Sequence, residues 1–371
     1  MGTWGASPAG AKAGTGTGYA GYSIRNVVHT SVGGTSARVR LSNAFGGVPV
    51  LMGHVTIAVA AGGETADAVP GTVRELTFGG RSSVSVPAGG KVSSDAVASA
   101  VPADGDLLVT TYTPEPSGPV TYHPMAAETS FYTRDGDHAM DTAGDAYHER
   151  TDSWHYVSEV AVLGSGATGS VIAFGDSITD GHSSTSGAAH RWPDLLADRL
   201  KEAPGGSRRG VLNAGVSANR LLLGQADSAG RSALTRFDDD VLASTAPRTV
   251  IVLEGINDIL LTPRQTDPAP IIDAYRRLTE RARAAGLAVL GGTLTPFKGS
   301  ATSEQLEATR TAVNDFIRTG GLFDAVIDFD AAVRDKTDPA KLAPEFDCGD
   351  HLHPNDAGYR AMANAVPVDR L

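Results

Sequence analysis

Cysteine is nearly absent from the 371-residue chain, which has only Cys348. A single thiol excludes an intrachain disulfide and gives no indication of the redox compartment. Long apolar runs are absent too: no stretch reaches the roughly 20 residues that a membrane helix needs, so we expect no membrane span. Basic residues are in deficit, with 31 Lys and Arg against 42 Asp and Glu. The deficit extends over both halves of the chain and excludes the basic surface that nucleic acid requires.

The N-terminus, "MGTWGASPAG", lacks the basic region and apolar core of a signal peptide. Two interpretations remain open. The protein is either secreted, with a leader that is not part of this chain, or cytoplasmic.

Length predicts two domains, because 371 residues exceed what one hydrophobic core usually covers. In the first half, short alternating runs are separated by Gly, Pro, Ser and Asp. Period-two alternation favours strands at 36–43, 54–60, 82–88, 106–113 and 158–164. We expect an all-β sandwich or jelly-roll-like accessory domain over 1–165, with no helix before residue 185.

The pattern changes after the small, flexible stretch 164–170, which is typical of a linker. Apolar strands are expected at 171–175, 210–215, 249–255, 287–295 and 324–329. Between them lie amphipathic segments such as 192–201, 270–286 and 303–321. Strands alternating with helices indicate a parallel sheet covered on both faces, so 166–371 is predicted to be an α/β domain.

Residues with possible catalytic roles lie at or after the ends of these strands. Ser177 comes two residues after the first, Gly215 closes the second, and Asn257 follows the third. Asp350 and His353 lie beyond the fifth in the spacing D-x-x-H. Ligands of open α/β sheets bind at the carboxyl ends of the strands, so these residues are expected to converge.

Their chemistry is complementary. A serine hydroxyl needs a base, which His353 would supply, and the base needs an orienting acceptor, which Asp350 would supply. Backbone N–H groups of Ser177 and Gly215, with the Asn257 amide, would stabilise an oxyanion. No G-x-S-x-G elbow is present, which argues against an α/β-hydrolase.

As a set, "GDSITDG" (175–181), "NAGVSANRL" (213–221), "GIND" (255–258) and "DHLHP" (350–354) resemble the motifs of the GDSL esterase/lipase superfamily, also called SGNH hydrolases. The resemblance covers roughly residues 171–366. It implies a flavodoxin-like three-layer α/β/α fold, no metal or other cofactor, and hydrolysis through an acyl-serine. It also implies the roles of Ser177 as nucleophile, Gly215 and Asn257 as oxyanion-hole residues, and Asp350 and His353 as acid and base.

The N-terminal stretches "TWGASP", "RNVVHTSVGG" and "VRLSNAFG" are similar to those of two-domain actinobacterial GDSL hydrolases, which are typically exported. This resemblance favours the secreted alternative.

Several residues have simpler interpretations. Ser177 would serve equally well as a helix cap. Asp347 is the alternative orienting acid, and His351 is expected to be a solvated neighbour of the base. Asp176, His182 and Asn219 are candidates for lining the substrate pocket. Aromatic residues of the first half, among them Tyr19, Tyr22, Tyr122 and Tyr132, are interpreted as core or edge in preference to a sugar-stacking surface.

The sequence therefore predicts a metal-independent serine esterase that acts on short-acyl esters, with small-molecule or acetylated carbohydrate substrates. A longer-chain lipase and an acyltransferase are the alternatives within the family. A carbohydrate-binding protein without catalysis is the alternative outside it. The oligomeric state is not indicated.

Overall fold

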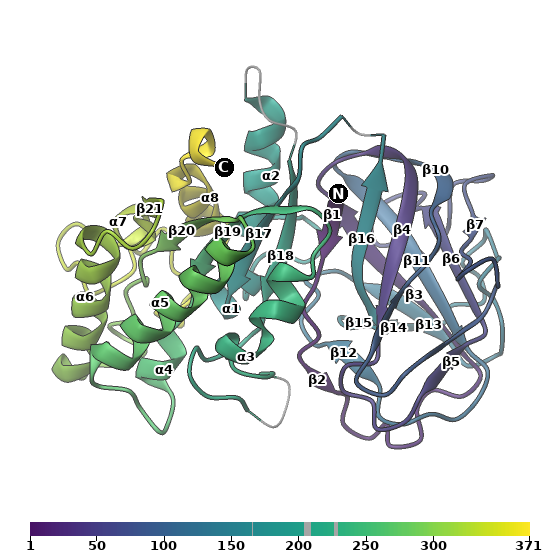
Figure 1. The fold of residues 1–371 in the computed structure, drawn as a ribbon, viewed down its shortest axis with the longest axis horizontal. Coiled ribbons are helices and arrows are strands. Elements are labelled where there is room, and N and C mark those ends of the chain that lie inside the picture. The colour runs from purple at the N-terminus through teal and green to yellow at the C-terminus, as the bar shows by residue number, and fades with distance from the viewer. Residues whose placement is uncertain (165, 204–208, 226–228) are drawn as a thin grey trace. The chain divides into compact units, whose positions relative to one another are not determined.

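The chain forms two compact units in a computed structural model that describes residues 1–164, 166–203, 209–225 and 229–371 (Figure 1). Met1–Thr168 forms the first unit, and the second contains nearly all of Gly169–Leu371. Residue 165, in the expected linker, lies outside the described residues.

The first unit is built from antiparallel strands, as expected. Its two larger sheets have the orders β1-β16-β4-β10, with β9 also paired to β4, and β14-β13-β3-β11-β6-β7. Smaller sheets join β15-β12-β2 and β5-β8. The strands are β1 (Gly2–Gly5), β2 (Gly10–Ala11), β3 (Tyr22–Thr30), β4 (Gly34–Ser42), β5 (Val50–Met52), β6 (His54–Val59), β7 (Arg74–Glu75), β8 (Val84–Val86), β9 (Lys91–Ser93), β10 (Val97–Val101), β11 (Gly105–Thr113), β12 (Thr121–His123), β13 (Ser130–Thr133), β14 (Glu149–Thr151), β15 (Trp154–His155) and β16 (Val157–Leu163).

One apolar core lies between the two larger sheets. Val39 of β4 and Val160 of β16 belong to it from one sheet, and Ile57 of β6 and Val109 of β11 from the other. Inward side chains alternate with exposed ones along β4, which is the pattern of a strand with one buried face. The packing is that of a sandwich.

The second unit alternates strands and helices. Its elements are β17 (Ser170–Gly175), α1 (Ser177–Asp180), α2 (Trp192–Glu202), β18 (Gly210–Gly215), α3 (Ala233–Phe237), the π-helix η1 (Asp238–Leu242), β19 (Pro247–Leu253), α4 (Ile256–Leu260), α5 (Pro268–Ala284), β20 (Ala288–Gly292), α6 (Glu304–Thr319), β21 (Ala325–Ile327), α7 (Phe329–Val333), α8 (Asp356–Ala365) and the 3₁₀ helix η2 (Val368–Arg370). The predicted parallel α/β domain is confirmed. Every residue of β17 is buried, as expected for a strand covered on both faces.

Strand order positions the functional residues. The sheet runs β18-β17-β19-β20-β21, so the order reverses between β17 and β19. This is the flavodoxin-like arrangement, in which ligands bind beyond the carboxyl ends of the two strands at the reversal. The segment after β17 carries Ser177, and the segment after β19 carries Asn257.

The expectation of no helix before residue 185 is wrong, because α1 begins at Ser177. This helix is a single turn of four residues, too short for the apolar periodicity from which helices are predicted. Its N-cap is Asp176, whose carboxylate accepts from the Ile178 N–H at 3.0 Å. Ser177 is therefore the first residue of the helix and does not cap it.

Candidate active site

The tight turn after β17 presents Ser177 at the end of the strand. A Cβ on Gly175 would lie 2.2 Å from Thr179 Oγ1 and 2.4 Å from the Leu253 carbonyl, so only glycine fits at this position. The helix that Ser177 begins ends at Gly181, which has a φ of 99°. Ser177 itself is 7% exposed. The hydroxyl is thus held in one place by a short, rigid connection.

His353 lies directly against this hydroxyl. Its Nε2 is 2.8 Å from Ser177 Oγ, and its Nδ1 is 2.5 Å from Asp350 Oδ2. The other carboxylate oxygen of Asp350 accepts from the backbone N–H groups of Leu352 and His353 at 2.9 and 2.8 Å. Asp350 is an acceptor for Nδ1–H, which leaves Nε2 free to accept from the serine.

Asp347 pairs with the other histidine of this loop. Its Oδ2 is 2.6 Å from His351 Nδ1, and its Oδ1 accepts from the Gly349 and His351 N–H groups at 2.7 and 3.0 Å. His351 has a φ of 63°, in the left-handed region. The loop thus holds two acid–histidine pairs, and the pair that contacts Ser177 is Asp350–His353.

For both Asp350 and His353, burial and hydrogen bonding shift the pKa in opposite directions. For Asp350, burial would raise the pKa of the carboxyl, but the hydrogen bonds from His353 and two backbone N–H groups outweigh it and hold the pKa well below its usual range. For His353, burial lowers the pKa below its ordinary value, against the raising effect of the Asp350 hydrogen bond. The arrangement favours a carboxylate beside a neutral imidazole.

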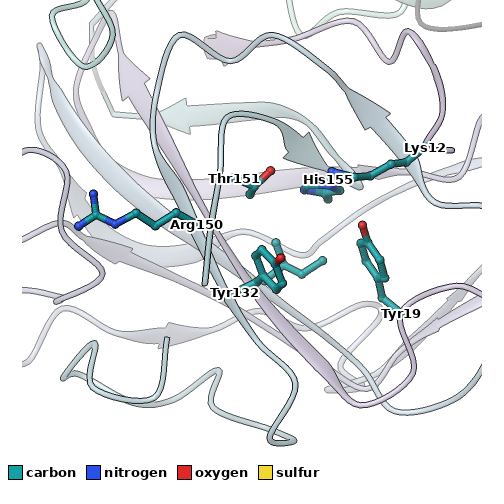
Figure 2. A pocket seen from close by; sticks show the side chains of 7 residues that line it. Lys12, Tyr19, Tyr132, Arg150, Thr151 and His155 are labelled. Atoms are coloured by element: carbon teal, nitrogen blue, oxygen red, sulfur yellow. Dashed lines mark hydrogen bonds between the residues drawn. The ribbon is translucent and has the colours of Figure 1, made fainter. Parts of the chain in front are cut away.

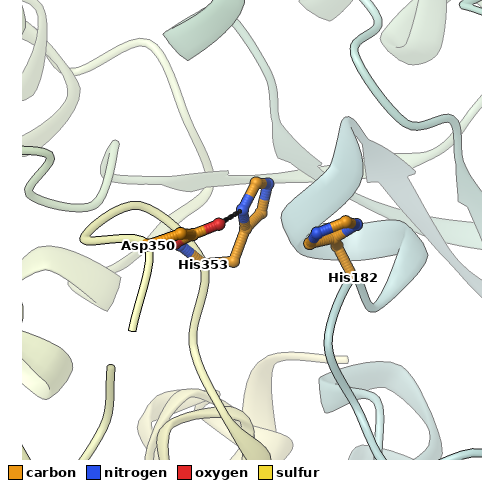
Figure 3. A group of neighbouring side chains, drawn as sticks. All are labelled: His182, Asp350 and His353. Atoms are coloured by element: carbon orange, nitrogen blue, oxygen red, sulfur yellow. Dashed lines mark hydrogen bonds and ion pairs between the residues drawn. The ribbon is translucent and has the colours of Figure 1, made fainter. Parts of the chain in front are cut away.

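His182 lies beside His353. The two ring centroids are 4.2 Å apart with the planes tilted by 44°, and charge on His182 further lowers the pKa of His353 (Figure 3). His182, Asp350 and His353 offer potential metal-ligand atoms within 4.8 Å of one another. Both ring nitrogens of His353 are already hydrogen-bonded, so a metal would have to displace Asp350 or Ser177.

Gly215 ends β18 against helix α1. A Cβ there would lie 2.2 Å from the Asp180 nitrogen, so its lack of a side chain permits this close approach. The Gly215 N–H, expected as an oxyanion donor, donates instead to Asn213 Oδ1 at 2.9 Å.

The loop after β18 contains a backbone donor that the sequence analysis missed. Ser217 is anchored to Asp180, with its N–H and hydroxyl 2.9 and 2.7 Å from Oδ2. The Asn219 carbonyl accepts from Asn257 Nδ2 at 3.0 Å. Between them, Ala218 is exposed, has a φ of 58°, and its N–H has no acceptor among the described residues. No glycine marks this left-handed position, so the sequence carried no signal for it.

The expected pocket residues differ in their surroundings. His182 adjoins His353, whereas Asp176 and Asn219 are each 1% exposed. Asp176 caps α1. Asn219 donates to the carbonyls of Ala229 and Arg231 at 2.6 and 2.9 Å, so its side chain braces the loop from inside.

Arg236 joins these elements beneath the site. Its guanidinium donates at 2.8 Å to the Gly175 carbonyl, to the Ala214 carbonyl and to Asn219 Oδ1. It also lies 3.3 Å from Glu254 Oε1. One buried cation therefore connects the ends of β17, β18 and β19.

Buried carboxyl groups surround this cation. Burial, together with the nearby charge of Asp258, raises the pKa of Asp176 to about 7. Burial also raises the pKa of Glu254 well above its usual value and that of Asp258 above its own. Asp258 is partly compensated, because it accepts from the Leu221 and Leu222 N–H groups at 2.6 and 3.0 Å.

Comparison with known proteins gives one sequence family. The model of the GDSL-like Lipase/Acylhydrolase family matches residues 173–361 of the 371-residue chain. No curated protein sequence matches the chain.

Several solved structures are similar over the second half. The alpha/beta hydrolase enzyme LAE5 from the metagenome of Lake Arreo is 22% identical, with a TM-score of 0.42 over 54% of this chain and 94% of its own. The acetyl xylan esterase AlAXEase is 22% identical, with a TM-score of 0.41 over 53% and 96%. A member of the lipolytic protein G-D-S-L family from Veillonella parvula is 20% identical, with a TM-score of 0.40 over 53% and 94%.

Helices of the described residues are all too short or too polar to cross a membrane. This agrees with the lack of long apolar runs in the sequence.

Proposed function

Because the chain belongs to the GDSL-like lipase/acylhydrolase family and is thereby a carboxylic ester hydrolase, we propose that it cleaves short-acyl esters through an acyl-serine formed on Ser177. The observation that carries the proposal is the continuous hydrogen-bonded series from Ser177 Oγ through the His353 ring to Asp350. Acetylated carbohydrates are the substrate class we propose, with the first unit as an accessory domain.

Acylation begins at the serine hydroxyl. Oγ attacks the ester carbonyl carbon while His353 Nε2 takes its proton, and Asp350 stabilises the imidazolium through Nδ1–H. The tetrahedral intermediate collapses when the C–O bond to the alcohol breaks. His353 returns the proton to the departing oxygen, so a neutral alcohol leaves and the acyl group remains on Ser177.

Deacylation repeats these steps with water. His353 takes a proton from water as its oxygen attacks the acyl carbon, and then gives the proton back to Ser177 Oγ when that bond breaks. The products are a carboxylic acid and the free enzyme. An alcohol acceptor in place of water would give acyl transfer, which is distinguished by measuring ester formation with an added sugar.

Three donors would stabilise the oxyanion. We propose the Ser177 N–H, the second N–H of Asn257 Nδ2 and the Ala218 N–H. The residues on either side of Ala218 are hydrogen-bonded to Asp180 of α1 and to Asn257, which supports a place for the Ala218 amide between these two elements. Gly215 then has the supporting role of allowing β18 to approach α1, since its own N–H is used by Asn213.

Acyl-chain length tests the substrate proposal. In the described part of the second unit, Leu223 is the one large hydrophobic side chain that is exposed, so an extended apolar surface for a long chain is lacking there. We expect kcat/KM to be highest for p-nitrophenyl acetate or butyrate and to fall for octanoate and palmitate. A channel that buried the chain would instead raise kcat/KM by about fourfold per methylene, from about 0.8 kcal/mol each. Such a rise would favour the longer-chain lipase.

The pH profile tests the base. His353 must be neutral to accept the serine proton, so activity is lost as the pH falls through its pKa. Since burial lowers this pKa, the acidic limb of kcat/KM for p-nitrophenyl acetate should have its midpoint below about 6.5, the ordinary value of histidine. His182→Gln removes a charge that lowers the pKa, and should move the limb to higher pH.

The control is His138→Gln, which removes a histidine of the first unit and should leave the limb in place. An unchanged limb in His182→Gln would show that the two rings do not interact electrostatically.

A further inference from the structure

A small cavity in the first unit combines a cation with aromatic walls. Its volume is about 120 Å³, roughly that of four water molecules in the liquid. The lining side chains include Lys12, Tyr19, Tyr132, Arg150, Thr151 and His155 (Figure 2). They come from β13, β14, β15 and the segment after β2, so residues far apart in the sequence line one cavity.

Lys12 is half-buried in the cavity lining and has no acidic partner among the described residues. Its Nζ lies 3.3 Å from His155 Nε2 and 5.6 Å from the centroid of the Tyr122 ring. Burial lowers the pKa of Lys12, and no carboxylate of the described residues forms an ion pair with it. A partly desolvated ammonium with no counter-charge is unfavourable by itself, and an anion placed beside it would relieve the cost.

His155 does not compete for that anion. Its ring is buried, and burial together with the charge of Lys12 lowers its pKa to about 3. The imidazole is neutral at physiological pH, so its Nε2 accepts one N–H of the ammonium. The remaining N–H groups of Lys12 are left to other acceptors.

Tyrosines form the other side of the cavity. Tyr19 stacks on Tyr22 at 4.5 Å between centroids, and Tyr22 stacks on Tyr132 at 6.0 Å, with interplanar angles of 11° and 10°. Burial, followed by the neighbouring tyrosines, raises the pKa of Tyr19 to about 12, so its hydroxyl keeps its proton and is a donor. Figure 2 shows Tyr19 facing the Lys12 and His155 side chains.

We propose that this cavity binds the carboxylate end of a hexuronic acid unit, with Lys12 and the Tyr19 hydroxyl donating to the carboxylate and the sugar ring packing against Tyr132. A ring face of the sugar is apolar enough to pack on an aromatic side chain, while its edge is polar. The cavity volume admits the carboxyl group and the adjoining ring atoms of one sugar residue. This favours a sugar residue at the end of a polysaccharide chain.

A single negative charge fits better than a phosphate. The cavity offers one ammonium, and the second cation, Arg150, extends away from Lys12 in Figure 2 and has its guanidinium 5.6 Å from the Phe131 ring centroid. Phosphate sites usually present a bidentate guanidinium or several backbone N–H groups. The proposal goes beyond ester hydrolysis, because all the residues involved belong to the first unit.

Calorimetric titration of the full chain with free sugars tests the proposal. The probes are glucuronic acid, glucose as its neutral match, and glucose 6-phosphate. We expect saturable binding of glucuronic acid and at least about tenfold weaker binding of glucose, because a hydrogen bond between charged groups is lost. Equal binding of the two, tighter binding of glucose 6-phosphate, or no binding of any sugar would overturn the proposal.

Variants locate the binding. Lys12→Met should weaken glucuronic acid binding by at least about tenfold, and Lys12→Arg should largely retain it. Arg81→Met removes an exposed positive charge from the same unit and should have no effect. Hydrolysis of p-nitrophenyl acetate should be unchanged in all three, so failure of this proposal is separable from failure of the esterase assignment.

Tyr132→Ala provides a second measurement if Lys12→Met fails to fold. This substitution removes the aromatic surface on which the sugar packs, and it should weaken the binding of glucuronic acid and of its oligomers to the same degree. Unaltered affinity in Tyr132→Ala would place the sugar elsewhere.

Discussion

Ser177→Ala should lower kcat for p-nitrophenyl acetate by about 10³- to 10⁶-fold while leaving thermal unfolding nearly unchanged. The hydroxyl contributes one hydrogen bond, to His353, and helix α1 is capped by Asp176, so the fold loses little. Steady-state kinetics and a melting curve of the two proteins make the comparison.

Ser184→Ala is the matched control, because its hydroxyl donates to the Gly181 carbonyl at 2.7 Å and is not hydrogen-bonded to His353. It should retain wild-type turnover. Comparable activity in Ser177→Ala and wild type would refute the nucleophile assignment. Mass spectrometry should also find a sulfonyl adduct on Ser177 after treatment with phenylmethylsulfonyl fluoride.

The second large effect is expected at Asp350, the proposed orienting acid. Asp350→Asn should reduce kcat by about 10⁴-fold, because an amide in place of the carboxylate favours the wrong tautomer of His353 and cannot stabilise its positive charge. The protein should remain folded, since the loop keeps its other hydrogen bonds. The measurement is kcat at a pH well above the acidic limb, where His353 of the wild type is neutral.

Asp347→Asn is the comparison that decides between the two acids. This carboxylate accepts hydrogen bonds from His351 and from two backbone N–H groups, so its loss should loosen the loop and lower the melting temperature. The loss of kcat should be smaller than in Asp350→Asn. A larger kcat loss in Asp347→Asn than in Asp350→Asn would reverse the roles that we propose.

Much of the second unit could be predicted from its sequence because parallel strands are continuous apolar runs. Strands β17 and β18 begin and end within a residue of their expected bounds. The D-x-x-H spacing also predicts which carboxylate reaches His353, since three residues of one turn suffice to place the Asp350 oxygen at Nδ1. In these cases the structure is determined by residues close together in the sequence, so the sequence pattern predicts it.

In the first unit, β3 was missed although it is central to its sheet. Its residues 23–28 are all buried, and Arg25 and Asn26 among them are polar, so neither alternation nor a clean apolar run marks the strand. Arg25 is accommodated because it donates to the Ala66 and Asp141 carbonyls at 2.5 and 2.8 Å. Such compensation comes from distant segments and leaves no local signal.

Two features of the proposed sites could not be predicted from the sequence: the Ala218 backbone and the contact between Lys12 and His155. Ala218 adopts a backbone conformation that glycine usually marks. Lys12 and His155 meet only because β2 and β15 both pair with β12, a fact of topology with no counterpart in spacing. The aromatic residues are interpreted as core or edge, and Tyr19, Tyr22 and Tyr132 do pack, partly buried, against the core of the first unit. That these three also form a stack beside the cavity could not be read from the sequence.

The hydrogen bonds of Arg236 limit how the substrate specificity of this enzyme could be changed. A single planar group holds Gly175, Ala214 and Asn219 at once, so a shift of one strand end would strain the hydrogen bonds of the other two. The proposed active site is therefore preorganised and has little freedom for induced fit. Directed evolution toward new esters should accumulate its productive substitutions in the surrounding loops and should reject nearly every replacement of this arginine.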